Sequence, residues 1–382
     1  MILPAKTAAI ILAAGYSRRM GRFKPLLALG GRPMIDWGID LFRACDVSAI
    51  HVVAGHRHDA LAPVLAKRGV AMVVNPDFQE GMFSSVKAGI RALSPACGAF
   101  FILPADIPLV RPATVRRLLA CFDARRAKVV VPSFACRPGH PPLVSGELAS
   151  SILEAQGSEG LRGVLAQWRW ETATVPVPDR FILHDADAPE DHQALEAACH
   201  RWGIPDDGEC DAILARPGPD PERILRHGRE VARVADVMTA ALRQAGFFLD
   251  PHLVHAAARV HDLAKGKPDH ARVGAERLRA LGFDAVAEIV ACHHDIVIDP
   301  QQPINAAEIV YLADRRVAGE RLVPLEERFA AALERYGKIA DARVNIHRRR
   351  AQALGVQARI EAALGRSVDA LLSSPSQDGD PR

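Results

Sequence analysis

The sequence has few aromatic residues, few cysteines and almost no excess charge. Aromatic residues make up 5% of the 382 residues, and the seven cysteines form no CxxC pair. An odd number of scattered cysteines argues against a disulfide framework and a zinc ribbon, and it favours a reducing cytoplasm. Lys and Arg number 48 against 45 Asp and Glu, a net charge of +3. This balance disfavours a protein that coats nucleic acid, so we expect no nucleic-acid partner.

Long apolar runs are also missing. No run approaches the ~18 residues that a helix needs to cross a bilayer, so we expect no membrane partner. What the sequence does have is 49% hydrophobic and 24% charged residues, the proportions of a folded globular protein. At ~150 residues per domain, the length predicts two or three domains.

Residues 1–198 alternate short apolar runs with longer amphipathic stretches. The runs are rich in Val, Ile and Phe and show no polar alternation, which is typical of strands covered by helices on both faces. The order predicts an α/β fold with a doubly wound, mostly parallel sheet, whose sites gather at the carboxyl ends of the strands. We predict strands at 8–12, 49–53, 71–74, 99–103 and 129–131 and helices at 35–45, 60–67, 84–93 and 113–121.

From about residue 222 the apolar residues follow helical spacing instead. This predicts a separate all-α domain over 222–372, with no strand. The stretch 199–221 contains four prolines and several acids, and we predict a linker there. Residues 373–382 are predicted to be a disordered tail. The expected helices of the second domain are 224–244, 251–264, 273–280, 285–294, 306–318 and 325–336.

A glycine-rich and basic loop, LAAGYSRRMGRFKPLL, covers Leu12–Leu27 at the end of the first predicted strand. Gly15 and Gly21 let backbone N–H groups approach an anion. Arg19 suits bidentate phosphate contacts, and Lys24 adds a point charge. The string is neither the GxGxxG pattern nor a P-loop. We interpret it as a triphosphate-binding loop; the alternative is an ordinary strand-to-helix loop with solvated arginines.

This loop resembles the signature of the MobA-like molybdopterin nucleotidyltransferases, enzymes with the nucleotide-diphospho-sugar transferase fold that join a nucleotide to a phosphorylated cofactor. The resemblance extends over roughly residues 6–195, and the LAAG form is similar to the cytidylyltransferase branch. It implies CTP (or GTP) and a phosphorylated pterin as substrates, with a molybdoenzyme as a further partner that receives the product. The nucleotide-binding residues that it implies in the loop are Leu12, Ala13, Ala14, Gly15 and Lys24.

Two further segments agree with this resemblance. The string NPDFQEGMFSSVKAGI is similar to the part that lines the nucleotide pocket, which implies nucleotide-binding roles for Asn75, Gly81, Ser84 and Ser85. Its alternative is a helix start capped by serine. The string FILPADIPLV places Asp106 just past an apolar strand, where a carboxylate can hold Mg²⁺ near the α-phosphate. The alternative there is an acid that caps a helix.

Three more segments complete the comparison. RPGHPPLVSGEL and GSEGLRGVL imply acceptor-binding roles for His140 and Arg162. Ser158 stands where the family usually has Asp, and Leu161 where it has Ala. A different acceptor, such as a sugar phosphate, and a guanylyltransferase that uses GTP therefore stay open. HDADAPEDHQAL implies that Asp187 is the second carboxylate ligand of Mg²⁺, although a strand end and helix cap would also explain it.

The resemblance implies a phosphoryl transfer in which the protein mainly positions the reacting groups. A terminal phosphate of the acceptor attacks the α-phosphorus of CTP, and pyrophosphate leaves. Mg²⁺ held by Asp106 and Asp187 neutralises developing charge, while the catalytic residues Arg19 and Lys24 hold the triphosphate. Electrostatic preorganisation should dominate such a transfer.

The second half contains an ordered series of histidines and aspartates. Imidazole and carboxylate together suit Mn, Fe, Ni or Zn, and the lack of thiolate in the series disfavours a structural zinc site. The strings ARVHDLAKGKPDHARVGAERL, AEIVACHHD and IVYLADR resemble the HD-domain metal-dependent phosphohydrolases over roughly 222–345. The resemblance implies a minimal ligand set of His227, His261, Asp262 and Asp314. The added ligands of relatives with two metals would be His270 and His293, or His294.

Two cations ~3.5–4 Å apart can hold a bridging water and clamp a phosphate for in-line attack. Asp262 is then the expected bridging ligand for one or two transition metals. Lys265 is an expected catalytic residue facing the phosphate, with a solvated helix-end lysine as the alternative. The sequence as a whole predicts a molybdopterin cytidylyltransferase-like enzyme fused to a metal-dependent phosphohydrolase. An HD domain that acts only as a non-catalytic nucleotide sensor stays open.

Overall fold

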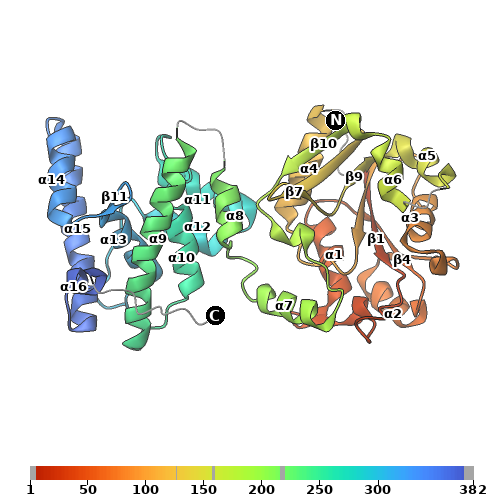
Figure 1. The fold of residues 1–382 in the computed structure, drawn as a ribbon, viewed down its shortest axis with the longest axis horizontal. Coiled ribbons are helices and arrows are strands. Elements are labelled where there is room, and N and C mark those ends of the chain that lie inside the picture. Colours follow the sequence, from red (N-terminus) through yellow and green to blue (C-terminus); the bar gives the residue numbers. More distant parts are fainter. Residues whose placement is uncertain (1–5, 126, 157–159, 216–219, 374–382) are drawn as a thin grey trace. The chain divides into compact units, whose positions relative to one another are not determined.

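The computed structural model describes residues 6–125, 127–156, 160–215 and 220–373. The chain divides into two compact units, Met1–Trp202 and Gly203–Arg382 (Figure 1). None of the helices described combines the length and the apolar character that a membrane span requires. Of the predicted tail, Ser373 ends a helix, and the remaining residues lie outside the described ones.

The first unit is a mixed, mostly parallel sheet, as predicted from the sequence. Its central strand β1 is parallel to β4 on one side and to β6 on the other. A short strand, β9, runs antiparallel between β6 and β7. Across the sheet the strands are β10 (Thr172–Pro176), β7 (Val129–Phe134), β9 (Leu143–Ser145), β6 (Ala99–Pro104), β1 (Thr7–Ala13), β4 (Ala49–Ala54) and β5 (Ala71–Val74), with β8 (Arg137–Pro138) on β7.

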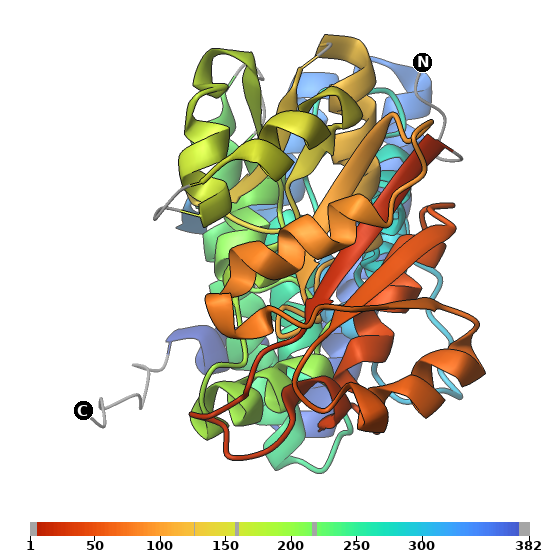
Figure 2. The same ribbon diagram turned by 90° about the vertical axis from the view of Figure 1, so that its right-hand side faces the viewer.

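Helices cover both faces of this sheet, and its central strands supply side chains to both sides. Ala9 and Ile11 of β1 pack into one core with α1 and α4, whereas Ile10 and Leu12 pack into another with α3, α5 and α6. In Figure 1, α1 and α4 lie on one side of β1 and α3 on the other, and Figure 2 shows α3, in orange, crossing the strands. Because successive residues of a strand point to opposite faces, double coverage explains the unbroken apolar runs.

The helices of this unit follow the predicted pattern but extend it. They are α1 (Met34–Arg43), α2 (His58–Arg68), α3 (Met82–Arg91), α4 (Pro112–Arg125), α5 (Ala149–Glu154), α6 (Gly160–Ala166) and α7 (Pro189–Cys199). A 3₁₀ turn, η2 (Lys24–Leu26), and a small hairpin of β2 (Ala28–Leu29) and β3 (Arg32–Pro33) close the loop after β1.

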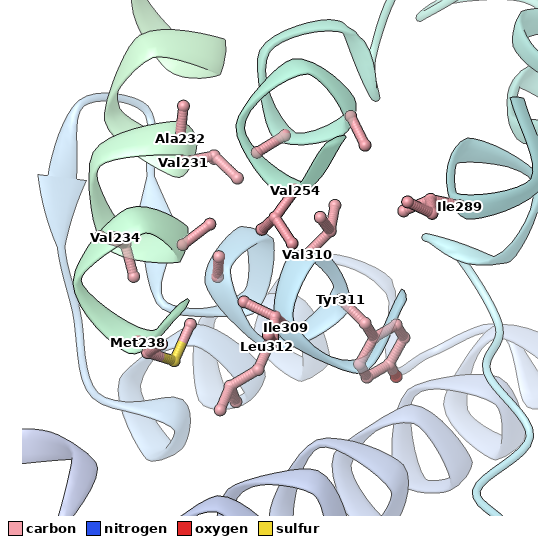
Figure 3. Packing of buried hydrophobic residues seen from close by; sticks show 14 of the residues in the cluster. Val231, Ala232, Val234, Met238, Val254, Ile289, Ile309, Val310, Tyr311 and Leu312 are labelled. Carbon is pink, nitrogen blue, oxygen red and sulfur yellow. The ribbon is translucent and has the colours of Figure 1, made fainter. Parts of the chain in front are cut away.

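The second unit is a helical bundle around one apolar core. Figure 3 shows Val231 and Met238 of α9, Val254 of α10 and Leu312 of α13 gathering in that core. The helices are α8 (Asp207–Leu214), α9 (Pro221–Gln244), α10 (Pro251–Val260), α11 (His270–Leu281), α12 (Asp284–Cys292), α13 (Ala306–Arg315), α14 (Leu325–Tyr336), α15 (Ala340–Leu364) and α16 (Val368–Ser373).

The helix predicted at 251–264 ends at Val260, and two further features of this unit differ from the sequence predictions. The predicted linker 199–221 contains α8, whose Cys210 and Leu214 are buried in the core of the bundle. The helix forms because Asp206 and Glu209 make a reciprocal capping box at its start. The predicted helix 306–318 ends at Arg315, and a hairpin of β11 (Val317–Ala318) and β12 (Arg321–Leu322) follows where no strand was expected.

Close packing of α9 on α10 depends on Gly228. A Cβ built there would lie 2.3 Å from the backbone oxygen of Arg259, so Gly228→Ala must push the two helices apart. We expect it to destabilise the helical unit by about 1–3 kcal/mol, the usual cost of overpacking. Urea unfolding followed by circular dichroism measures the change.

The matched control is Gly274→Ala on α11, where a Cβ meets Val290 at an ordinary 3.4 Å. There the better helix propensity of Ala should leave stability unchanged or raise it by up to about 1 kcal/mol. Equal effects of the two substitutions would contradict the packing described.

Candidate functional sites

The first candidate site lies at the carboxyl ends of β1 and β6. The basic loop leaves β1 there, and Asp106 follows two residues after β6 ends. The Ala105 N–H donates to the Leu12 oxygen at 2.9 Å, and the Ala186 N–H donates to the Asp106 oxygen at 2.9 Å. Three segments that are far apart in the chain therefore meet at this edge, and they bring Asp187 beside Asp106.

Four charged side chains converge at this edge, and we call them the lysine–aspartate cluster: Arg19, Lys24, Asp106 and Asp187. The Lys24 Nζ lies 3.0 Å from Asp106 Oδ2 and 2.7 Å from Asp187 Oδ1. Arg19 reaches the other oxygen of Asp187, with 2.7 Å between Nη2 and Oδ2. A small cleft of about 90 Å³ beside the cluster is lined by Gly15, Lys24 and Asp106, among others.

Electrostatics favour the ionised forms of Lys24 and Asp187. Burial lowers the pKa of Lys24, but hydrogen bonds and attraction to Asp187 and Asp106 outweigh it and raise that pKa above its usual value. The hydrogen bond from Lys24 lowers the pKa of Asp187. Burial, followed by the charge of Asp187, raises the pKa of Asp185. At neutral pH the cluster therefore presents an ammonium group between two carboxyl groups.

The lowered pKa of Asp187 predicts a pH-dependent stability in the absence of divalent metal. A carboxyl group whose pKa is lower in the folded state adds stability above its ordinary value of 3.8 and loses it as the pH falls through the folded value. Asp187→Asn should therefore destabilise the first unit at pH 7 and have a shrinking effect below about pH 4. Urea unfolding in chelator at a series of pH values measures this.

Glu147→Gln is the control, because that carboxyl group is 71% exposed in its pair with Lys128. We expect little effect from it at any pH, since exposed pairs contribute little. A destabilisation by Asp187→Asn that is as large at pH 3 as at pH 7 would contradict the pairing described.

Two carboxylates at this edge fit Mg²⁺, which prefers hard oxygen ligands. The Lys24 ammonium group is a cation that already lies between Asp106 and Asp187. The two carboxylates are therefore arranged to face positive charge. Asp106 and Asp187 would hold the ion, and Arg19, whose side chain is 74% exposed, is open to a bound triphosphate.

The predicted nucleotide-binding residues after β5 are brought together, mainly by contacts with one another. The Asn75 Nδ2 donates to Ser84 Oγ at 2.9 Å and to Ser85 Oγ at 3.0 Å. Ser84 Oγ also lies 2.8 Å from the Gly81 oxygen, to which it donates. Gly81 is exposed and has a φ of +101°, which favours glycine. This network holds the start of α3 against the loop after β5. The N-cap of α3 is Gly81 and no side chain caps the helix, so the alternative of a helix start capped by serine is wrong.

The two predicted acceptor-binding residues differ in their surroundings. The Nδ1 of His140 is buried and has no hydrogen-bond partner within the part of the chain that the structure describes. Burial lowers the pKa of His140, with Asp106 and Asp185 opposing the shift. Arg162 is exposed on α6, and Ser158 lies outside the described residues. The ring contacts the Ile102 backbone, so Nδ1 is the nitrogen of His140 that is left available to a ligand.

An aromatic cluster beside the basic loop was missed by the sequence analysis. The ring centroid of Tyr16 lies 5.1 Å from that of His56 and 5.2 Å from that of Phe78, and the Arg18 guanidinium lies 4.5 Å above Tyr16. The three rings follow β1, β4 and β5, so they share the carboxyl edge of the sheet. Their positions just after three parallel strands are the sequence signal that could have identified them. The rings offer a flat surface for a planar base or pterin.

The second candidate site collects side chains from five helices of the second unit. His227 lies on α9, His261 and Asp262 directly follow α10, and Asp314 lies in the last turn of α13. The first residue of α11 and the residue after α12 complete it. We call these six residues the metal donor cluster: His227, His261, Asp262, His270, His293 and Asp314. All are buried except His270, which is half-buried.

Asp262 stands between two groups of imidazoles. Its Oδ2 lies 3.7 Å from His227 Nε2 and 3.6 Å from His261 Nε2. Its Oδ1 lies 3.6 Å from His270 Nε2 and 3.9 Å from His293 Nε2. Two groups of donor atoms, each close enough to hold a metal ion, therefore share this one carboxylate.

The first of these groups is completed by Asp314. Its Oδ1 lies 3.3 Å from His227 Nε2 and 3.5 Å from His261 Nε2. Arg315, which the sequence analysis did not single out, donates to the other oxygen of Asp314 and to the backbone oxygens of His293 and His294. A buried arginine thus orients this carboxylate, as groups outside a ligand set commonly do.

The imidazoles are prepared as metal ligands by their backbone contacts. His227, His261 and His293 each place Nδ1 2.6–2.8 Å from a backbone carbonyl oxygen. A carbonyl oxygen can only accept a hydrogen bond, so Nδ1 carries the proton. The lone pair of Nε2 then points toward the other donor atoms of the cluster. Burial lowers the pKa of His293 to about 3, whereas at His261 the carboxylates of Asp262 and Asp314 outweigh burial and raise the pKa. The His261 Nε2 is buried without a hydrogen-bond partner, so the cluster fits one or two divalent transition metals.

The two remaining predicted residues lie at the margin of the donor cluster. Lys265 donates to Asp262 Oδ2, and its side chain is 52% exposed, so it can reach a bound phosphate. His294 belongs to neither donor group. Its Nδ1 lies 3.4 Å from Arg349, and burial, followed by Arg349 and Arg315, lowers the pKa of His294 to about 4. The structure therefore brings His293, and not His294, among the donor atoms.

Comparison with family models finds two matches in the chain. Residues 9–173 match the MobA-like NTP transferase domain, and residues 224–319 match the HD domain. The molybdenum cofactor cytidylyltransferase of Escherichia coli (strain K12) is 28% identical over 185 residues, which cover 48% of this chain and 91% of that protein. Bifunctional protein GlmU of Geotalea daltonii is 33% identical over 129 residues, 33% of this chain. The chain spans only 28% of the length of that GlmU.

Among solved structures, a nucleotidyl transferase from Methanothermobacter is 22% identical and covers 51% of this chain and 98% of its own, with a TM-score of 0.45. Molybdopterin-guanine dinucleotide biosynthesis protein A from Archaeoglobus fulgidus is 18% identical, with coverage of 51% and 99% and a TM-score of 0.41. The two family matches confirm both resemblances inferred from the sequence. This chain therefore joins a MobA-like NTP transferase domain, residues 9–173, to an HD domain, residues 224–319.

Proposed function

We propose that the first domain transfers CMP from CTP to a phosphorylated molybdopterin-type cofactor, and that the HD domain hydrolyses a phosphate ester. The observation that carries the transferase proposal is the lysine–aspartate cluster at the carboxyl ends of β1 and β6. The likeness to a cytidylyltransferase over 91% of that protein's length supports the choice of reaction. A cytoplasmic location, and delivery of the product to a molybdoenzyme, belong to the same proposal.

In the transfer, a terminal phosphate oxygen of the acceptor attacks the α-phosphorus of CTP. The bond to the β-phosphate oxygen breaks, and pyrophosphate leaves with both electrons of that bond. Lys24 and Arg19 supply the positive charge that binds the triphosphate and stabilises the leaving group. Mg²⁺ held by Asp106 and Asp187 would neutralise charge on the reacting phosphate.

In the hydrolysis, a water oxygen attacks the phosphorus, the ester P–O bond breaks, and the alcohol leaves with a proton. One or two divalent cations in the metal donor cluster would polarise the phosphate and activate the water. Asp262 keeps both donor groups together, Arg315 holds Asp314 in place, and Lys265 adds a positive charge at the solvent side.

A sugar phosphate is the second candidate for the acceptor. GlmU relatives are more identical to this chain than the cytidylyltransferase is, although over a shorter span. A screen that pairs CTP, GTP, ATP and UTP with molybdopterin and with sugar 1-phosphates, read as pyrophosphate release, decides between them. We expect turnover with CTP and molybdopterin. Turnover of a sugar phosphate without turnover of molybdopterin would overturn the proposal.

For the HD domain, the competing function is a non-catalytic nucleotide sensor. Metal content of the purified chain and phosphate release from p-nitrophenyl phosphate test it. We expect at least one transition metal per chain and a loss of metal and activity in His261→Ala. Less than one metal per chain, with no effect of His261→Ala, would favour the sensor.

A further inference from the structure

A cavity of about 480 Å³ adjoins the metal donor cluster. Two of its lining residues contact the cluster: Arg315 donates to Asp314, and the ring centroid of His294 lies 4.7 Å from that of His270. Most of its wall comes from β12, α14 and α15, between residues 321 and 349. These elements lie outside the HD match, which ends at residue 319.

The wall of this cavity is strongly basic. Among the described residues that line it, Glu327 is the single acid, facing five arginines: Arg315, Arg321, Arg328, Arg335 and Arg349. Three of these are compensated, because Arg315 pairs with Asp314, Arg349 with Asp295, and Arg321 with Glu327. The excess positive charge of the wall therefore lies on Arg328 and Arg335.

Arg328 and Arg335 form no ion pair with any carboxylate in the described part of the chain. They are seven residues apart on α14 (Leu325–Tyr336), so they lie on one face of the helix, with ~10 Å between their positions along its axis. Arginine binds phosphate and carboxylate oxygens through bidentate contacts. Two unpaired arginines on one cavity wall thus make a ready site for an anionic group.

The inner wall of the cavity is apolar. Val323, Phe329 and Ile346 line it and are buried, at 1%, 5% and 9% exposure. Tyr336 lies at the open side, and the Arg335 guanidinium is 5.2 Å from its ring centroid. An apolar wall with an aromatic ring accepts a planar ring system, whereas a bare inorganic anion would leave it unused.

We propose that this cavity is the specificity pocket of the HD site, in which Arg328 and Arg335 bind a second anionic group of the substrate. The ligand is an organic phosphate with a planar ring and at least two anionic groups, and its reacting phosphate lies at the metal donor cluster. The proposal rests on the phosphohydrolase function proposed above for the HD domain. It assigns selection of the substrate to residues outside the HD match.

Binding tests the pocket without any need for turnover. Adenosine 3′,5′-bisphosphate and AMP are titrated by calorimetry into the full chain, and both probes can also bind at the transferase site. We expect that Arg328→Gln with Arg335→Gln weakens one bisphosphate-binding event about 100-fold, since each charge-assisted contact is worth on the order of tenfold. AMP, which lacks the second phosphate, should lose less than about threefold. Arg350→Gln, an exposed arginine of α15 outside the cavity, is the control and should change neither.

Turnover supplies an independent measurement at the same site. Inhibition of p-nitrophenyl phosphate hydrolysis by the bisphosphate should weaken about 100-fold in the double variant. Unchanged bisphosphate binding in the double variant, or an equal loss of affinity for AMP, would overturn the proposal that this pocket binds a second anionic group. Absence of any hydrolysis would instead refute the proposed function, and the calorimetric result would still decide the pocket. Circular dichroism checks that the double variant is folded.

Discussion

Asp262→Asn is expected to remove nearly all bound transition metal and to lower HD-domain hydrolysis by about 10³-fold or more. Asp262 is the one carboxylate shared by both donor groups, with Oδ2 toward His227 and His261 and Oδ1 toward His270 and His293. Asn keeps the shape but loses the negative charge and one of the two anionic oxygens. The group of His270 and His293 is then left with neutral imidazoles, and the group of His227 and His261 keeps Asp314 as its single carboxylate, so both hold a divalent cation more weakly.

The measurement is metal content per chain by atomic emission, together with phosphate release from p-nitrophenyl phosphate. Asp236→Asn is the matched control, because Asp236 also contacts a histidine, His255, but outside the donor cluster, and its side chain is 43% exposed. We expect that control to keep its metal and its activity. An Asp262→Asn chain that retains a full complement of metal would show that the donor cluster is not the metal site.

Lys24→Met should lower kcat/KM for nucleotidyl transfer by about 10²–10³-fold, the usual cost of losing one preorganised donor to a transferring phosphate. The substitution removes the only ammonium between Asp106 and Asp187 among the described residues, and it leaves two carboxyl groups facing one another. Binding of the triphosphate then loses a positive charge that burial and hydrogen bonding had fixed in place. Pyrophosphate release with varied CTP separates the effect on KM from the effect on kcat.

Lys128→Met is the control for this variant, since Lys128 forms a pair with Glu147 on the surface of the same unit. We expect no change in transfer there. Lys24→Arg keeps the charge, and it should recover part of the loss. Transfer that is equally fast in Lys24→Met and in the parent would remove Lys24 from the mechanism.

Much of the fold could be predicted because its patterns are local. Double burial makes β1, β4, β6 and β7 continuous apolar runs, and the helices between them carry apolar residues at regular spacing. What escaped prediction was short or non-local. The strands of the β11–β12 hairpin have two residues each, too few for any alternation, yet its turn places the Gly319 oxygen 2.8 Å from His227 Nδ1.

The composition of the candidate sites followed from sequence motifs, but their geometry did not. The strings around Asp106 and His261 named the charged residues, whereas contacts such as Lys24 with Asp187 join residues 163 positions apart. The choice between His293 and His294 also needed the fold, because the end of α12 turns His293 toward Asp262 and leaves His294 against Arg349. The arginines of α14 carry no motif and became visible only as one wall of a cavity.

We infer that one chain holds two separate phosphate-handling centres. The most direct test compares Asp106→Asn and Asp262→Asn in the full chain, with pyrophosphate release from CTP and molybdopterin recorded beside phosphate release from p-nitrophenyl phosphate. We predict that the first variant loses only the pyrophosphate signal and the second only the phosphate signal. Two results would contradict two independent centres. One is a variant that loses both signals, and the other is that both variants keep both signals.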